Sequence, residues 1–326
     1  MNIFITGSSG FIGKHLIEKL TNRKNMVTGY DVAEPAISNE SFEHISGDIC
    51  DKDNLINALN QKKHDVIIHL AAKHHDFGVS EEEFFEVNER GTKNLIEAAD
   101  VCGVKNFLFF SSVAVYGDRS KPVMDDAVCE PTSFYGKSKL AAEKVLEEWT
   151  DADNERAVNV IRPVVVFGPE NYANMYHLIS KIANKKFIFI GKGSNVKSIA
   201  YVENVVNAAL FLLDNMAPGI SYYNYSDEPQ MPIKEIVKKI AKYAGVKIPG
   251  FQIPLFPALV LTYPFDLLEK TTGRIFPITA KRIRKFNTPT HYESKKIRTK
   301  GFRQTVSADE AFEKTLKWFT NRDNNV

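Results

Sequence analysis

The sequence predicts an α/β fold: a doubly wound parallel sheet joined to a smaller, mixed C-terminal domain. Short β-rich runs alternate with amphipathic segments through the first half of the chain, which is the pattern of repeated strand–helix units. Residues 66–68 and 107–110 are apolar at every position. A half-exposed strand would alternate apolar and polar residues, so we expect these strands to be buried on both faces, as in a parallel sheet.

Each element follows from its local pattern. Strands are expected at residues 2–6, 26–30, 65–70, 106–112 and 157–161, and helices with a three-to-four-residue apolar period at 11–20, 53–59, 84–99 and 134–149. After Pro169 the pattern loosens, with helices expected at 172–183, 203–213, 233–243 and 308–319 and a short strand at 187–190. Residues 249–292 hold six of the fourteen prolines and predict irregular, loop-connected structure.

The bulk composition excludes several classes of function. The 326 residues carry 42 basic and 40 acidic side chains, a net charge of +2, so no overall field attracts nucleic acid. The three cysteines are scattered, as in a reducing compartment, and the adjacent His74 and His75 lack a third ligand, so no metal site is expected. No signal peptide and no membrane-spanning run of about 18 apolar residues is present, which predicts a cytoplasmic location.

Three glycines, Gly7, Gly10 and Gly13, lie with Ser9 between the first expected strand and the first helix. The first allows the chain to reverse, the second allows a pyrophosphate to approach the backbone, and the third allows close helix–strand packing. The helix N-terminus then offers unpaired N–H groups to phosphates. This Rossmann-type pattern predicts a dinucleotide-binding domain over residues 1–170, with part of 196–227 returning to it. Residues 171–195 and 228–326 are expected to form the substrate-binding domain.

An aspartate indicates which dinucleotide is used. Asp31 ends the second strand, 18 residues after Gly13, where a carboxylate can accept hydrogen bonds from both ribose hydroxyls of adenosine. It would repel a 2′-phosphate, so the sequence predicts NAD in preference to NADP. His69 is expected to be a packed side chain and not a ligand. The residues expected near the adenine and along the end of the third predicted strand are Asp48, Ile49, Leu70, Ala71 and Ala72.

The candidate catalytic residues are Ser112, Tyr135 and Lys139. Tyr135 and Lys139 are four residues apart and share one face of a predicted helix. A tyrosine, whose free pKa is about 10, needs a neighbouring ammonium to act as a base at neutral pH. Ser112 ends the fourth strand at its carboxyl end, where ligands bind in open α/β sheets, and its hydroxyl can hold the substrate oxygen that Tyr135 deprotonates.

Several motifs together carry a resemblance to a known family: Gly7-x-x-Gly10-Phe11-Ile12-Gly13, His69-Leu70-Ala71-Ala72, Val87-Asn88-x-x-Gly91-Thr92, Ser111-Ser112-x-x-Val115-Tyr116-Gly117, Tyr135-x-x-x-Lys139 and Arg162-Pro163. They resemble the extended short-chain dehydrogenase/reductase family, and in particular its sugar-nucleotide epimerases of the UDP-glucose 4-epimerase kind. The match is good over residues 1–215 and weaker beyond. It implies an NAD-dependent enzyme. Members of the family often form homodimers through a pair of helices, for which the helices at 84–99 and 134–149 are the candidates here, although the sequence itself leaves the oligomeric state open. The further cofactor contacts that it implies are Phe11, Ile12, Asn88, Ser111, Pro163 and Val164.

Two residues narrow the reaction within that family. Its dehydratases carry an acidic pair directly after the catalytic serine or threonine, where this chain has Val113 and Ala114. Neither side chain can move a proton, so dehydration is not expected. The leading hypothesis is C4 epimerisation of a nucleotide-linked sugar, with a UDP-sugar favoured, through a 4-keto intermediate. The alternatives are an NAD(P)H-dependent 4-ketoreductase, 3β-hydroxysteroid dehydrogenase-like alcohol oxidation, and a cofactor-binding protein without catalysis.

The contacts to the sugar diphosphate depart from the family pattern. Val165 occupies the place of an asparagine, and Lys197 replaces an arginine, which weakens bidentate phosphate recognition. We expect Asn174 to substitute for the lost asparagine, and Lys73 or His74 to contact substrate or cofactor.

The basic tail around Arg282 and Arg284 has three possible interpretations: a solvated face, a diphosphate contact, or contact with a lipid surface that carries the substrate. The apolar run at 256–268 would by itself supply only marginal membrane affinity.

Overall fold

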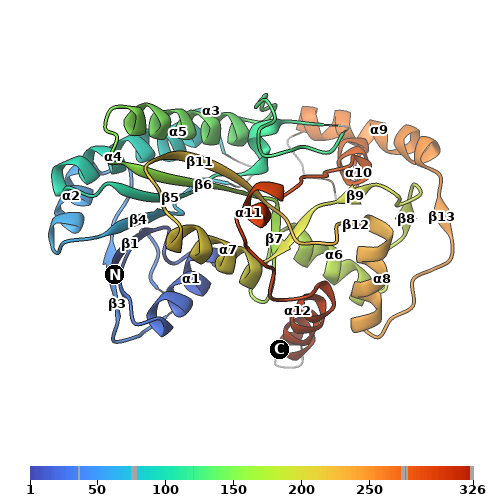
Figure 1. Cartoon of the computed structure of the whole chain (residues 1–326). Helices are drawn as coiled ribbons and strands as arrows, with labels where there is room; N and C mark the ends of the chain where they lie inside the picture. Colours follow the sequence, from blue (N-terminus) through green and yellow to red (C-terminus); the bar gives the residue numbers. More distant parts are fainter. Residues whose placement is uncertain (36, 75–78, 120, 273–275, 277, 324–326) are drawn as a thin grey trace.

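The computed structural model describes residues 1–326 apart from residues 36, 75–78, 120, 273–275, 277 and 324–326. Its main sheet has seven parallel strands in the spatial order β11-β6-β5-β4-β1-β2-β3 (Figure 1). The predicted doubly wound α/β fold is therefore confirmed. The strands are β1 (Asn2–Thr6), β2 (Met26–Asp31), β3 (Phe42–Ser46), β4 (Val66–His69), β5 (Asn106–Phe110), β6 (Ala157–Pro163) and β11 (Gly219–Tyr225).

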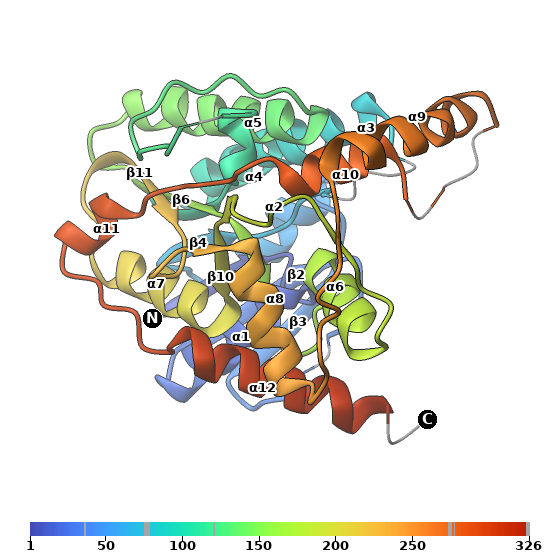
Figure 2. The same ribbon diagram turned by 90° about the vertical axis from the view of Figure 1, so that its right-hand side faces the viewer.

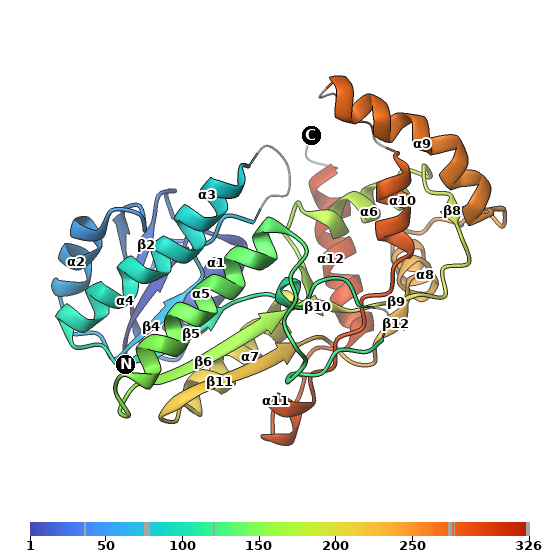
Figure 3. The ribbon, with the colours of Figure 1, turned by 90° about the horizontal axis from the view of Figure 1, so that it is seen from above.

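Helices cover both faces of this sheet (Figures 1 and 3). One face carries α2 (Lys52–Asn60), α4 (Gly91–Cys102) and α5 (Phe134–Asp151), and the other carries α1 (Phe11–Asn22) and α7 (Val202–Asp214). Successive side chains of a strand turn to opposite faces. In β1, Phe4 joins the core beneath α2, α4 and α5, whereas Ile3 and Ile5 join the core beneath α1 and α7. Strands buried on both faces explain the unbroken apolar runs.

Two strands of the sheet were not predicted from the sequence. Both β3 and β11 lie at its edges, with one neighbour each. No residue of β3 is buried, and only the last three residues of β11 are, so neither shows the continuous apolar run of a central strand. The parallel pairing of β11 with β6 nevertheless brings residues 219–225 back to the N-terminal sheet.

The predicted helix at 84–99 is divided in the structure. It consists of α3 (Glu81–Phe85), a π-helical turn η1 (Glu86–Arg90) and then α4. A π turn inserts an extra residue into the helical repeat and changes the direction of the side chains around it. Asn88 is in this turn and is buried.

A second lobe gathers beyond one end of the sheet (Figure 3). Its helices are α6 (Asn174–Ala183), α8 (Ile233–Tyr243), α9 (Leu255–Thr272), α10 (Ala280–Asn287) and α12 (Ala308–Asp323). Three short strand pairs accompany them: β7 (Val165–Phe167) with β10 (Ile199–Tyr201), β9 (Val196–Lys197) with β12 (Met231–Pro232), and β8 (Phe189–Ile190) with β13 (Gln252–Ile253). The short helix α11 (Lys295–Thr299) packs instead against β11 of the main sheet.

The prediction of irregular structure over residues 249–292 is wrong, because α9 and α10 occupy much of it. Pro257 lies in the first turn of α9, where a backbone N–H has no helical partner in any case. Pro264 lies inside the helix and removes one hydrogen bond, to the carbonyl of Val260. The Val260 side chain is exposed, so water on the open side of the helix can donate a hydrogen bond to that carbonyl.

Candidate functional site

The turn from β1 into α1 requires glycine for steric reasons. Gly7 has a φ of +72°, and a Cβ atom on it would lie 2.5 Å from the backbone nitrogen of Ala71. A Cβ atom on Gly13 would lie 2.5 Å from the carbonyl oxygen of Gly7. Gly10 caps α1 without any side-chain hydrogen bond. The first N–H groups of α1 can therefore receive a pyrophosphate at close range.

Asp31 is held beside this turn. One carboxylate oxygen accepts a hydrogen bond from the backbone N–H of Ser9, and the other accepts one from Ala33, both at 3.0 Å. The Ser9 hydroxyl donates to the Ala33 carbonyl at 2.8 Å. Each oxygen of a carboxylate can accept a second hydrogen bond, so Asp31 retains the capacity to bind a ribose diol.

The other residues predicted to contact the cofactor follow the neighbouring strands of the sheet. The Tyr30 hydroxyl donates to the carbonyl of Asp48, and the Asn94 amide donates to that of Ile49, at 3.0 and 3.2 Å. Leu70, Ala71 and Ala72 follow β4, which pairs directly with β1. The fold thus brings these predicted cofactor residues to the same edge of the sheet as the glycine turn.

His69 is a packed side chain, as predicted. It is fully buried, and its two ring nitrogens lie 2.7 Å from the Thr6 hydroxyl and 3.0 Å from the Thr92 hydroxyl. Burial lowers its pKa well below the usual value, so the ring is neutral. Among the described residues no group of three or more His, Cys, Asp or Glu side chains is arranged to hold a metal ion; His75 lies outside those residues.

The first turn of α5 packs against the segment that follows Ser112. The Ser112 hydroxyl accepts a hydrogen bond from Ala114 at 3.1 Å and begins a 3-10 turn, η2 (Val113–Tyr116). A Cβ atom on Gly136 would lie 2.4 Å from the carbonyl oxygen of Ala114, so glycine allows this contact. Tyr135, adjacent to Gly136, therefore lies in the turn of α5 that packs against the residues after Ser112.

Lys139 lies one helical turn after Tyr135 and is 1% exposed. Its ammonium is 4.1 Å from the centre of the Phe109 ring. Burial lowers the pKa of Lys139 to about 7, and the Glu143 carboxylate opposes the shift. A lysine that exchanges its proton near neutral pH suits a site where a neighbouring phenol acts as a base.

Sequence reasoning missed a buried network that anchors α5. Arg162 at the end of β6 binds both carboxylate oxygens of Glu143, at 2.9 and 2.6 Å. It also donates to the Tyr116 hydroxyl at 2.7 Å, and that hydroxyl donates to Asn224 at 2.8 Å. The network therefore joins α5, β6, η2 and β11. The signal was available, since Glu143 is four residues after Lys139 and shares its helical face.

Asn88 connects the end of β4 to α5. Its amide accepts the backbone N–H of Lys73 at 2.7 Å, and it donates to the Lys73 carbonyl at 3.0 Å and to the Ser138 hydroxyl at 2.8 Å. The π turn directs it there. Asn88 was expected to contact the cofactor; the bonds that the structure shows fix the helix that carries Tyr135 and Lys139.

The other residues expected at the cofactor lie in or next to the same elements. Phe11 and Ile12 are half-buried in the first turn of α1. Ser111 follows β5, and its buried hydroxyl has no hydrogen-bond partner within the described residues. Pro163 ends β6, and Val164 donates its N–H to the carbonyl of Tyr225 at 3.0 Å. An unsatisfied buried hydroxyl at the carboxyl end of the sheet fits a ligand bound there.

Lys197 binds the protein itself. Its ammonium donates to the carbonyls of Lys285 and Thr288, at 2.9 and 2.5 Å, where α10 ends. Burial and the nearby charge of Lys285 lower its pKa to about 8. Lys197 therefore fixes α10 to β9. The sequence predicted a phosphate contact for this lysine and did not predict this structural role.

The remaining substrate candidates are more scattered. Arg282 pairs with Glu269 of α9 at 3.3 Å, and Arg284 is exposed. Asn174 is exposed at the start of α6. Lys73 and His74 follow β4, on the strand edge where the cofactor residues lie.

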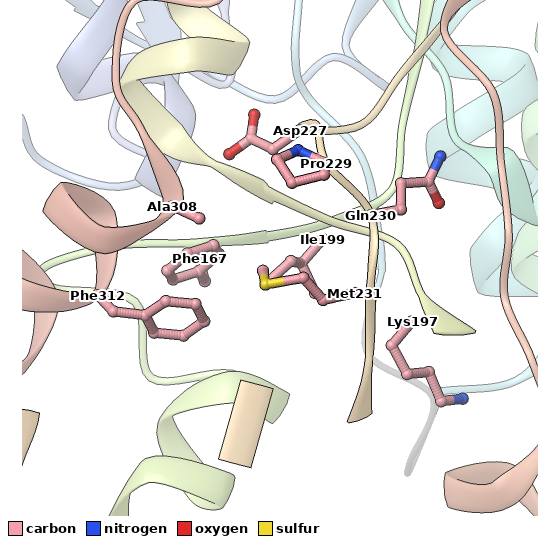
Figure 4. A pocket seen from close by; sticks show the side chains of 9 residues that line it. All are labelled: Phe167, Lys197, Ile199, Asp227, Pro229, Gln230, Met231, Ala308 and Phe312. Atoms are coloured by element: carbon pink, nitrogen blue, oxygen red, sulfur yellow. The ribbon is translucent and has the colours of Figure 1, made fainter. Parts of the chain in front are cut away.

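A small pocket lies away from the predicted catalytic residues, beneath β10, β12 and α12 (Figure 4). Most of its wall is apolar. Its one carboxylate, Asp227, accepts the backbone N–H of Tyr201 at the start of α7, at 2.8 Å, and burial raises its pKa to about 6. Asp227 thus has a structural role in the start of α7. The lining residues are Phe167, Lys197, Ile199, Asp227, Pro229, Gln230, Met231, Ala308 and Phe312.

Comparison with known proteins agrees with this geometry. Residues 3–225 match the model of the NAD dependent epimerase/dehydratase family. The chain is 35% identical over 321 residues to the N-acetyl-alpha-D-glucosaminyl-diphospho-ditrans,octacis-undecaprenol 4-epimerase of Escherichia coli O157:H7, covering 97% of this chain and 95% of that protein. It is 30% identical over 264 residues to the UDP-glucose 4-epimerase of Vibrio cholerae, covering 78% of each.

A solved structure shares the fold. MoeE5, in complex with UDP-glucose and NAD, superposes with a TM-score of 0.79 at 23% identity, covering 99% of this chain and 100% of that one. The family match spans more than half of the chain, and the relative from Escherichia coli spans nearly all of it. The chain therefore belongs to the NAD-dependent epimerase/dehydratase family, whose members are enzymes of the extended short-chain dehydrogenase type.

Proposed function

We propose that this protein is an NAD-dependent 4-epimerase of a sugar that is carried on a diphosphate. One observation supports this reaction above all. Tyr135 and the buried Lys139 lie on the helix that packs against the turn after Ser112, and that turn contains Val113 and Ala114 in place of acidic residues. In this proposal Tyr135 is the proton-transfer group, and the two positions after Ser112 offer no acid for eliminating water.

Three residues of the chain have distinct roles in such a reaction. The Ser112 hydroxyl holds the C4 oxygen of the sugar, and Tyr135 takes the C4 hydroxyl proton. A positive charge on Lys139 stabilises the phenolate that begins the step. NAD held at the glycine turn and Asp31 would supply the hydride chemistry at C4. After the 4-keto sugar has turned about its diphosphate link, the opposite face of C4 is presented for reduction, and Tyr135 returns the proton to the C4 oxygen.

The glycine turn, Asp31 and the Ser111 hydroxyl fit NAD at the carboxyl edge of the sheet. Because Asp31 would accept the ribose diol and repel a 2′-phosphate, NAD should bind at least about tenfold more tightly than NADP, a difference of about 1.4 kcal/mol. Calorimetric titration with each dinucleotide measures the ratio, and Asp31→Ala should narrow it. Equal affinities in the unaltered protein would remove Asp31 from this role.

A nucleotide such as UDP is one candidate carrier for the sugar, as the resemblance to UDP-glucose 4-epimerases suggests. A polyprenyl diphosphate is the second, because the relative that is 35% identical over 97% of this chain is named for an undecaprenyl-linked substrate. Val165 has no polar group for a phosphate, and the Lys197 ammonium is engaged with two carbonyls. Because both carriers present a diphosphate, these two residues do not distinguish them, and the second carrier is favoured by that relative alone.

Label retention separates the epimerase from the alternatives. An epimerase returns its hydride, so substrate deuterated at C4 should give a C4 epimer that keeps the deuterium, without added NADH. NMR of the product from a UDP-sugar and from a prenyl diphosphate sugar would show the configuration and the carrier. Loss of the label, or an absolute requirement for NADH with a 4-keto substrate, would favour the ketoreductase instead.

A further inference from the structure

Helix α9 exposes most of its apolar side chains. Ala258 is its only buried residue. The exposed fractions of Phe256, Leu261, Tyr263 and Leu267 are 77%, 73%, 62% and 60%. Isolated exposed apolar residues are ordinary, but a contiguous group of large ones on a protein surface marks an interaction site.

The helix is also at the outer edge of the molecule. In Figures 2 and 3, α9 lies at the far side of the C-terminal lobe, with α10 between it and the rest of the lobe. Packing against α10 is its main contact with another element. Phe256 and Leu261 lie about 140° apart around α9, and both are exposed, so no described element covers either flank of the helix at these positions.

Positive charge accompanies this apolar helix. Residues 249–292 contain six basic and two acidic residues, in a chain that is otherwise nearly balanced. Both acids are directed at α10: Asp266 accepts the backbone N–H of Lys281 at 3.2 Å, and Glu269 pairs with Arg282 at 3.3 Å. The exposed Lys270, Lys281 and Arg284 therefore give the surface a positive character.

We propose that the face formed by α9 and α10 docks on the surface of an anionic phospholipid bilayer. The apolar side chains of α9 enter the boundary between headgroups and acyl chains, and the basic residues meet lipid phosphates. The helix lies in the plane of the membrane, since no helix in the described residues is long and apolar enough to cross it.

A second copy of the chain is a poorer occupant of this face. A two-fold contact brings the same patch of each subunit together, so the basic residues of α10 would face the same basic residues of the partner and repel them. Anionic headgroups complement that charge. Docking would place the enzyme beside substrates held in the membrane by a polyprenyl chain, a consequence that rests on the proposed epimerase function, whereas the docking itself does not.

Vesicle sedimentation tests the docking. The full chain should bind vesicles of phosphatidylcholine with about 30% phosphatidylglycerol at least about tenfold more strongly than pure phosphatidylcholine vesicles, and less strongly when salt rises from about 0.1 to 0.5 M. Phe256→Ser with Leu261→Ser should reduce binding by about tenfold or more, and Lys270→Gln with Lys281→Gln should remove the preference for anionic lipid.

Val101→Ser with Val128→Ser is the matched control, because these residues are 67% and 71% exposed on other parts of the surface. It should bind vesicles as the unaltered protein does. The proposal is overturned if the unaltered protein does not bind anionic vesicles, or if the α9 variant binds them with the same affinity as the unaltered protein. Light scattering that showed the α9 variant dissociating a dimer, without vesicle binding by either form, would assign the face to a second copy.

Activity distinguishes failure of docking from failure of the proposed reaction. A diphosphate sugar with a short, water-soluble prenyl chain needs no membrane, so the α9 variant should turn it over as the unaltered protein does. With a long-chain substrate in vesicles, the variant should be at least about tenfold slower. Vesicle binding without turnover of any sugar would support the docking proposal and contradict the proposed epimerase activity.

Discussion

Tyr135→Phe should lower kcat by roughly two to four orders of magnitude, the usual contribution of a positioned proton-transfer group. Phenylalanine keeps the ring that packs near Phe84, whose centroid is 6.2 Å from that of Tyr135. It removes only the hydroxyl that would accept and return the C4 proton. The affinity for NAD should remain within about twofold, because the glycine turn and Asp31 are untouched. Steady-state kinetics and calorimetry on the same preparation measure both quantities.

Tyr243→Phe is the corresponding control. The Tyr243 hydroxyl donates to Asp309 between α8 and α12, at 3.0 Å, and has no part in the proposed reaction. Its loss should leave kcat unchanged. If Tyr135→Phe kept a third of the activity, another residue would have to be the base, and Lys139 or the Ser112 hydroxyl would be the next to examine.

The sequence predicted the first half of the structure well because its signals there are local. The glycine turn must be glycine to avoid backbone collisions, and the central strands are apolar because both faces are buried. The four-residue spacing of Tyr135 and Lys139 sets their shared helical face without reference to the rest of the fold. Edge strands β3 and β11 lack such a signal, since each has one neighbouring strand and few buried residues.

The parts that were missed depend on tertiary contacts. Arg162 is recognisable as part of a motif, but its partners Glu143 and Tyr116 come from elements 19 and 46 residues away. The prolines around α9 suggest loops, yet one lies in the first turn of the helix and the other breaks a single bond on an exposed helix. Lys197 was expected at a phosphate, and only the fold shows that it also holds the end of α10.

Lys139→Met should make the protein more stable at neutral pH while removing most of its activity. The folded state lowers the pKa of this lysine from 10.5 to about 7, because the side chain is buried. The folded protein thus binds fewer protons there than the unfolded chain does. By linkage, this residue lowers stability most at and below about pH 7, and the penalty disappears as pH rises toward 10.5.

Methionine has a similar length, carries no charge, and can keep the contact with the Phe109 ring. Glu143 does not lose its partner, because Arg162 binds both of its oxygens. The variant should therefore gain roughly 2–4 kcal/mol of unfolding free energy at pH 7, and the gain should shrink by more than half at about pH 9.5. Urea unfolding of both proteins at the two pH values measures the difference. The exposed neighbour Lys137, changed to methionine, should show neither effect. If the Lys139→Met protein unfolded more easily than the unaltered one at pH 7, the prediction would be wrong. The surroundings of the Lys139 ammonium would then stabilise the folded state and not lower its stability.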